Sequence, residues 1–208
     1  MVMPANASNA VVHYMAGRYP GSVGWLIGPS SVKKTKLRMW MPYALDNDAF
    51  QSFSKGIEWD EGAWLRMLEW ASRQEFKPRW ALVPDVVGDK IATLEKWAKY
   101  SPTVKRFGFK LAFAAQDGMV KSDVPSDSDI VFVGGTTQWK WATVEMWARE
   151  FKRVHVGRVN SVQKLYHLRC LGVESVDGTG WFRDTENGPR VKGLLEFAGE
   201  NFGRTQMF

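Results

Sequence analysis

Short apolar segments alternate with segments of helical periodicity along the whole chain, and this alternation constrains the fold more than any other feature. Eight apolar segments are predicted to be strands, at residues 11–15, 23–27, 37–45, 80–84, 107–115, 129–134, 153–157 and 173–176. Helical periodicity is clearest at residues 61–73, 91–100, 141–152, 162–171 and 191–202. Near-continuous apolar strands separated by helices are typical of a parallel sheet that is buried on both faces.

The predicted fold class is α/β, a compact (β/α)8 TIM-like barrel with short or missing helices. Eight strands suit such a barrel, but 208 residues is near its lower length limit, so several helices must be short or absent. An open doubly wound sheet is the alternative. Since 45% of the residues are hydrophobic and no Pro/Gly/Ser linker divides the chain, we expect residues 1–208 to form a single domain.

Composition narrows the class of protein further. A single cysteine, Cys170, excludes an internal disulfide framework and a Cys-rich zinc site. The sequence shows no signal peptide and no apolar run long enough to span a membrane, so we expect a cytoplasmic protein, in the host cytoplasm if a phage encodes it. The net charge of +6, from 28 Lys and Arg against 22 Asp and Glu, favours a polyanionic partner.

Polar residues follow the predicted strands from the third to the eighth, at the point where each strand ends. A single aspartate in such a place is most often part of a turn or a helix cap, but six polar strand ends in succession weaken that interpretation. In parallel α/β folds the carboxyl ends of the strands face one shared pocket, so we expect these side chains to converge. The residues concerned are Asp46, Asp85, Gln116, Gly134 with Gly135, Arg158 with Asn160, and Asp177.

Converging carboxylates without a metal-binding quartet narrow the chemistry. Paired carboxylates suit glycosyl transfer, in which one attacks or stabilises an oxocarbenium-like centre and the other handles the proton of the leaving group. A Mg²⁺ site is a competing use, but no local motif supports it, and we expect no metal and no cofactor. The Gly134-Gly135 pair lacks a dinucleotide fingerprint and favours close approach of its N–H groups to a flat ligand. The three histidines, among them His155 in a predicted strand, are interpreted as packing or surface residues.

Taken in order, the strand-end segments resemble those of a known family. The segments are "LDNDAFQSF", "VPDVVGD", "AFAAQDGM", "FVGGTTQWK", "HVGRVNS" and "GVESVDGT". They are similar to the signatures of the tRNA-guanine transglycosylase barrel, and most similar to its phage-type relatives of the deazapurine DNA modification protein A type. The resemblance covers residues 42–181. Two departures stand out, since Asp48-Ala49 replaces the family's Gly-Gly pair and the Cys-rich zinc site is missing.

The resemblance implies an enzyme that exchanges guanine in DNA for a 7-deazaguanine such as preQ0 through a covalent Asp-glycosyl intermediate. It implies that Asp177 is the nucleophile and that Asp46 is the acid/base group. The base would be bound by Phe50, Asp85, Gln116, Gly134 and Gly135. Independently of the family, a phosphate could be held by Arg158, Asn160 and Ser161 ahead of a helix, with a simple helix cap as an equal alternative.

The expected partners follow from the same resemblance. They are DNA, with tRNA less favoured because the zinc element is missing, a 7-deazaguanine base as small-molecule substrate, and a protein partner or a second copy of the chain. No membrane partner is expected. Two other functions stay open: a nucleosidase or deoxyribosyltransferase that uses the same carboxylates on free nucleosides, and a non-catalytic, basic nucleic-acid-binding module. Asp48 has no assigned role.

Overall fold

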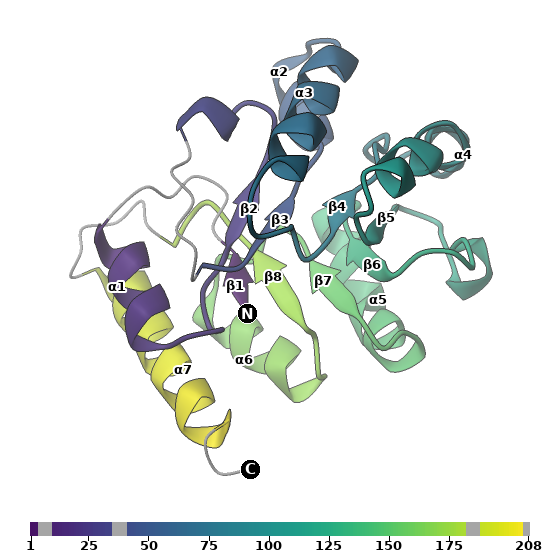
Figure 1. Ribbon diagram of the computed structural model, residues 1–208. Helices are drawn as coiled ribbons and strands as arrows, with labels where there is room; N and C mark the ends of the chain where they lie inside the picture. The colour runs from purple at the N-terminus through teal and green to yellow at the C-terminus, as the bar shows by residue number, and fades with distance from the viewer. Residues whose placement is uncertain (4–9, 35–40, 182–187, 206–208) are drawn as a thin grey trace.

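The computed structural model describes residues 1–3, 10–34, 41–181 and 188–205. Eight parallel strands form one sheet in the order β1-β8-β7-β6-β5-β4-β3-β2. A parallel bridge between Val2 and Val23 brings the two ends of the sheet together, so the sheet forms a nearly closed (β/α)8 barrel (Figure 1). The strands are β1 (Val2–Met3), β2 (Trp25–Ile27), β3 (Tyr43–Leu45), β4 (Ala81–Leu82), β5 (Leu111–Ala115), β6 (Ile130–Val133), β7 (Val154–Val156) and β8 (Ser175–Asp177).

The helices surround this barrel unevenly. They are α1 (Ala10–Arg18), α2 (Ala49–Lys55), α3 (Glu61–Ser72), α4 (Lys90–Arg106), α5 (Thr137–Glu150), α6 (Val162–Cys170) and α7 (Pro189–Thr205). Between β5 and β6 the chain forms only the 3-10 turn η2 (Lys121–Asp123), and the described residues between β2 and β3 contain only η1 (Val32–Lys34). The predicted barrel with short or missing helices is therefore confirmed. Within the described parts of the chain, no helix has the length and apolar character needed to cross a membrane.

Two apolar clusters lie on opposite faces of the strands. In β5 the side chains of Ala112 and Ala114 face the barrel interior, while Leu111, Phe113 and Ala115 belong to the core between strands and helices. This alternation is the two-residue period of a strand. The interior also contains the large Trp80 side chain, and the small alanines leave the volume that it needs.

One predicted strand is a helix in the structure, and the true first strand was missed. Residues 11–15 belong to α1, where Val12, Met15 and Ala16 are buried at the i, i+3, i+4 spacing of one helical face. The first strand is Val2–Met3, which is too short to show any periodicity. Of the third predicted strand, at residues 37–45, the structure forms β3 at Tyr43–Leu45. Its residues 37–40 lie outside the described residues.

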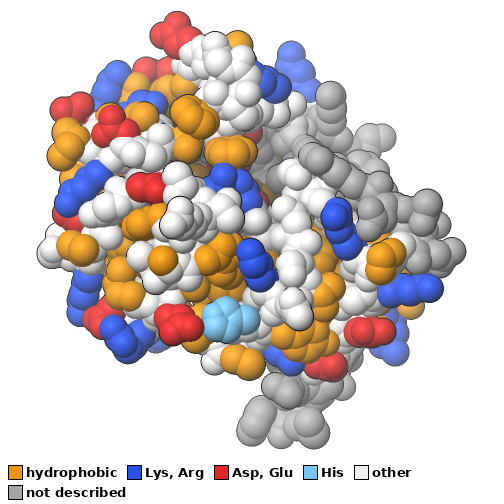
Figure 2. Space-filling view, turned by 180° about the vertical axis from the view of Figure 1, so that it is seen from behind, with side chains coloured by type: hydrophobic (Ala, Val, Ile, Leu, Met, Phe, Trp, Pro, Cys, Tyr) orange, Lys and Arg blue, Asp and Glu red, His pale blue; other side chains and the backbone are white. Residues whose placement is uncertain are grey.

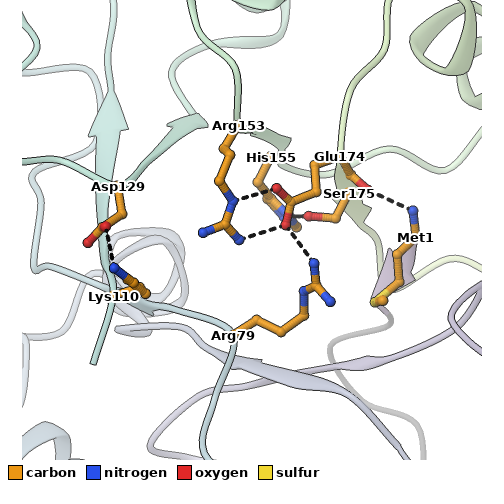
Figure 3. Close-up of polar contacts among 8 residues, drawn as sticks. All are labelled: Met1, Arg79, Lys110, Asp129, Arg153, His155, Glu174 and Ser175. Atoms are coloured by element: carbon orange, nitrogen blue, oxygen red, sulfur yellow. Dashed lines mark hydrogen bonds and ion pairs between the residues drawn. The ribbon is translucent and has the colours of Figure 1, made fainter. Parts of the chain in front are cut away.

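An ion-pair cluster joins three strands at the amino-terminal end of the barrel. Glu174, just before β8, accepts hydrogen bonds from Arg153 Nε at 2.7 Å and Nη2 at 2.8 Å, and from Arg79 Nη2 at 3.0 Å (Figure 3). The two arginines precede β7 and β4. Hydrogen bonds from Arg153, followed by those from Arg79, lower the pKa of Glu174 to about 2. This end of a TIM barrel serves stability, and the cluster fits that role.

Replacing Glu174 with Gln is expected to lower the free energy of unfolding at pH 7 by roughly 2 kcal/mol, after allowance for the partial exposure of the cluster. The pKa of Glu174 is lower in the folded than in the unfolded chain, so its contribution is present above about pH 4.5. That contribution is lost as the pH falls towards 2. Urea unfolding at pH 7 and pH 3 measures it, with Glu95→Gln on the exposed side of α4 as control. An equal loss at both pH values would contradict the ionic origin.

Candidate active site

A cavity of about 440 Å³ opens at the carboxyl ends of the strands. Nine of the ten site residues predicted from the sequence line it, and Ser161 is the one that does not. The nine are Asp46, Phe50, Asp85, Gln116, Gly134, Gly135, Arg158, Asn160 and Asp177. The expected convergence of strand-end side chains is therefore present. The described residues contain no group of three or more His, Cys, Asp or Glu side chains placed to hold a metal ion.

Asp177 ends β8 and is almost fully buried, with 7% of its surface exposed. Its Oδ1 accepts a hydrogen bond from the backbone N–H of Arg158 at 3.1 Å, and its Oδ2 lies 3.1 Å from His155 Nε2. Arg158 adopts a left-handed conformation with φ of 58°, which turns its N–H towards the carboxylate. These two contacts thus restrict the orientation of Asp177 at the mouth of the barrel.

Asp46 follows β3 and is half-buried beside the same cavity. Burial raises the pKa of Asp46 well above its usual range, and the nearby carboxylates of Asp48 and Asp177 raise it further. A backbone hydrogen bond from Asn47 N to Oδ1 at 2.8 Å offsets part of this effect. Asp46 is thus the carboxyl group of this cavity that is best suited to hold a proton.

Asp85 follows β4 and is held by two amide side chains. Its Oδ1 accepts a hydrogen bond from Asn47 Nδ2 at 2.7 Å, and its Oδ2 accepts one from Gln116 Nε2 at 2.7 Å. Burial raises the pKa of Asp85, although the Asn47 hydrogen bond and the charge of Lys96 oppose the change. Each carboxylate oxygen has a second lone pair, so Asp85 can still accept a donor from a ligand.

Gln116 and the Gly134-Gly135 pair are engaged mainly with the protein itself. Gln116 Oε1 accepts hydrogen bonds from Gly88 N at 3.0 Å and from Gly135 N at 3.1 Å. Gly134 N donates to Ala115 O at 3.0 Å. The predicted use of the two glycine N–H groups towards a flat ligand therefore requires that these internal bonds be shared or broken. Gly135 is still required sterically, because its φ is 59° and a Cβ there would lie 2.7 Å from Asp117 Oδ2.

Phe50 and Arg158 meet across the mouth of the cavity. The Arg158 guanidinium carbon lies 4.3 Å from the centroid of the Phe50 ring, and its Nη2 donates to Gly135 O. Phe50 on α2 is 44% exposed, so one ring face is covered by Arg158 while much of the side chain remains open. A flat ligand would have to stack on the uncovered part of the ring or displace Arg158.

The three residues predicted to hold a phosphate do not form one unit. Arg158 and Asn160 line the cavity, but Asn160 Oδ1 accepts a hydrogen bond from Gly180 N at 2.7 Å and so fixes the loop after β8. Ser161 is the N-cap residue of α6, and its side chain makes no capping hydrogen bond. The phosphate site stays a prediction.

Asp48, which the sequence left without a role, ties two loops of the mouth together. Its Oδ2 accepts a hydrogen bond from Ser30 N at 2.7 Å, on the loop that follows β2. It stands at the N-terminus of α2 with φ of 59°, a conformation that aspartate and asparagine tolerate better than other side chains. Gly28 packs directly against its carboxylate. The Asp48-Ala49 departure is therefore compatible with an ordered lip.

Asp48→Ala is expected to lower the free energy of unfolding by about 1–3 kcal/mol, because alanine is strained at positive φ and cannot accept the Ser30 hydrogen bond. Asp48→Asn keeps both properties and is expected to cost less than about 0.5 kcal/mol. Urea unfolding of the two variants measures the difference in their free energies of unfolding. The comparison requires that the two variants have the same m-value. Equal losses in the two variants would show that the charge of Asp48 matters and the loop tie does not.

Sequence reasoning missed three residues that shape the site. Asn47 connects the ends of β3 and β4, since its Nδ2 donates to Val83 O at 3.0 Å as well as to Asp85.

Lys140 is buried and donates to Gly157 O at the end of β7. Burial and the charge of Arg158 lower the pKa of Lys140 to about 8. The burial of Lys140 could have been predicted from the sequence, because Lys140 shares the helical face of Val144 and Trp147. His155, interpreted as a packing or surface residue, contacts Asp177 directly.

No family model matches the chain, and no curated protein matches its sequence. Its fold is similar to that of 3-hexulose-6-phosphate synthase from Salmonella typhimurium, with a TM-score of 0.56 and 10% identity over 96% of this chain and 98% of that one. It is also similar to a mutant tryptophan synthase alpha-subunit from Pyrococcus furiosus, with a TM-score of 0.57 and 13% identity over 97% of each chain. Identities this low show a shared barrel fold and nothing finer.

These comparisons overturn the resemblance to tRNA-guanine transglycosylases. The structural neighbours belong to other TIM-barrel families, so exchange of guanine in DNA for a 7-deazaguanine is a wrong prediction. The physical reason lies in the motifs, which are short loops of Asp, Gly and Gln at strand ends. Loops of these residue types are common at the strand ends of parallel barrels, so their succession reports the fold more than the family.

The face of the molecule shown in Figure 2 has no distinct binding surface for the predicted polyanionic partner. Lys and Arg side chains are interspersed there with Asp, Glu and hydrophobic side chains. The described side chains on that face form no continuous basic patch. A nucleic-acid partner, a protein partner and a second copy of the chain stay predictions.

Proposed function

We propose that the chain is an acid–base hydrolase that acts on a small polar molecule. The observation that carries the proposal is the contrast between two carboxyl groups of one cavity. Burial and neighbouring charges raise the pKa of Asp46, whereas Asp177 accepts a hydrogen bond from Arg158 N and lies against His155 Nε2. A buried carboxyl group with a raised pKa beside a second carboxyl group held by side-chain and backbone contacts is an arrangement that suits an acid and a base.

The proposed reaction uses both groups in one step. Asp46 gives its proton to the leaving heteroatom of the substrate as the bond from carbon to that atom breaks. Asp177 takes a proton from a water molecule, and the water oxygen forms the new bond to carbon. The products are an alcohol or acid and the protonated leaving group, and solvent returns the proton from Asp177 to Asp46. General acid and base catalysis of this kind contributes about 10²–10⁴-fold for each group.

The cavity supports a substrate class. A volume of about 440 Å³ suits a small molecule and is within the range of ordinary ligand pockets. Asp85 presents buried carboxylate oxygens, which favour a substrate that donates N–H or O–H groups at one edge. The exposed part of Phe50 offers an apolar surface for a flat ring at the mouth.

The test is an untargeted assay of a cell metabolite extract in water enriched in ¹⁸O. We expect wild-type protein to consume at least one small molecule and to place one ¹⁸O atom in a product. A variant carrying both Asp46→Asn and Asp177→Asn is expected to leave that compound unchanged, and Glu95→Gln is expected to behave as wild type. Consumption by the double variant, consumption without ¹⁸O, or no consumption by wild type would each overturn the proposal.

A further inference from the structure

His155 lies inside the barrel, where the proposed chemistry does not require a titratable group. It is fully buried on β7, with its imidazole ring stacked on Phe132 at 4.7 Å and edge-on to Trp80 at 4.9 Å between ring centroids. Two aromatic side chains therefore restrict the plane of the ring. A polar ring in so apolar a place needs hydrogen-bond partners for its nitrogens.

Both ring nitrogens have partners on the neighbouring strand β8. Nδ1 lies 2.8 Å from Ser175 Oγ, and Nε2 lies 3.1 Å from Asp177 Oδ2. Ser175 and Asp177 are two residues apart on one strand and so point to the same face. His155 pairs with Ser175 in the parallel register, and Figure 3 shows the two side chains next to each other. The imidazole therefore contacts Ser175 with one nitrogen and Asp177 with the other.

The chemistry of the partners decides which nitrogen carries the hydrogen. A carboxylate only accepts hydrogen bonds, so the Nε2 that faces Asp177 must carry the hydrogen. A neutral imidazole then has a bare Nδ1, which accepts the hydroxyl hydrogen of Ser175. The carboxylate thereby selects the tautomer, and the Ser175 hydroxyl, which can donate or accept, donates to the bare Nδ1.

We propose that His155 is a positioning residue for Asp177, in the tautomer whose Nε2–H donates to the carboxylate and whose Nδ1 accepts the hydroxyl hydrogen of Ser175. The tautomer and the orientation of Asp177 are properties of the fold alone, and only the kinetic consequence rests on the proposed hydrolase function. Ser175 lies next to Glu174, whose ion pairs with Arg79 and Arg153 anchor the start of β8. The support of Asp177 thus extends from the amino-terminal end of the barrel to its mouth.

Nitrogen NMR of the ring tests the tautomer without any substrate. The chain has three histidines, so the signals of His155 are identified by their absence from His155→Gln, and those of His13 and His167 serve as internal controls. We expect a hydrogen on Nε2 and a bare Nδ1. In Ser175→Ala we expect the same tautomer with a shifted Nδ1 signal, because Nδ1 loses the hydrogen bond from the hydroxyl. A hydrogen on Nδ1, or a ring with hydrogens on both nitrogens, would overturn the assignment.

Crystal structures of two variants test the positioning, again without substrate. Glutamine places an amide N–H near the position of Nε2, so His155→Gln is expected to keep Asp177 in place, whereas His155→Leu is expected to let the carboxylate rotate. An unmoved Asp177 in His155→Leu would overturn the proposal. If the metabolite assay identifies a substrate, His155→Leu should lower kcat about 10²-fold with little change in KM, and His155→Gln should restore most of it. A normal kcat in His155→Leu would show that the contact is structural only.

Discussion

Asp177→Asn is expected to lower kcat/KM by about 10³-fold for the substrate identified in the metabolite assay. Asparagine has the shape of aspartate, but its single amide oxygen can accept only one of the two hydrogen bonds, from Arg158 N or from His155 Nε2, and its NH2 group faces the other donor. It has no basic oxygen able to take the proton of the attacking water. The loss should therefore fall on kcat, with KM changed much less, and steady-state kinetics measure both.

The matched control for this variant is Asp89→Asn. Asp89 is the N-cap of α4, where its side chain accepts a hydrogen bond from Ala92 N at 3.0 Å, and asparagine caps helices about equally well. The same chemical change outside the cavity should leave both the kinetics and the thermal unfolding unchanged. If Asp177→Asn kept the wild-type kcat, Asp177 could not be the base, whatever other residues contribute.

The barrel was predictable because its signal is repeated. The eight strands together produce an alternation of apolar and helical segments that survives one wrong assignment, the helix at residues 11–15. The convergence of Asp46, Asp85 and Asp177 was predictable for a related reason, since parallel strands bring their carboxyl ends to one side. Strand β1 could not be predicted from periodicity, because a strand of two residues is too short to show a periodic pattern.

The internal bonding of the site was not predictable in the same way. Asn47 stands between two aspartates, and nothing local shows that its amide donates to Asp85 from 38 positions away. His155 lies between two valines and has the sequence context of a packing residue, although its ring contacts Asp177. Such contacts depend on strand register and ring orientation, which a linear pattern does not carry. The same limit explains the wrong family, because loop motifs record residue types without their bonding.

Asp46→Asn is expected to raise the free energy of unfolding at pH 7 by about 1 kcal/mol while removing most of the activity. Because the pKa of Asp46 is higher in the folded than in the unfolded chain, ionisation at neutral pH costs more in the folded state. That cost is absent below about pH 3.8, grows as the pH rises through the folded-state pKa, and is complete above it. Asparagine carries no charge and keeps an oxygen for the Asn47 N–H, so it avoids the cost at every pH.

Urea unfolding of wild type and Asp46→Asn between pH 3 and pH 8 measures this difference. The stability gain should be near zero at pH 3 and should increase with pH, and Asp89→Asn should show no such trend. A gain that is the same at all pH values would assign the effect to packing, and a loss at pH 7 would show that the ionised carboxyl stabilises the fold. The combination of higher stability with lost activity is expected only if the fold maintains Asp46 in an unfavourable environment because its proton is needed there.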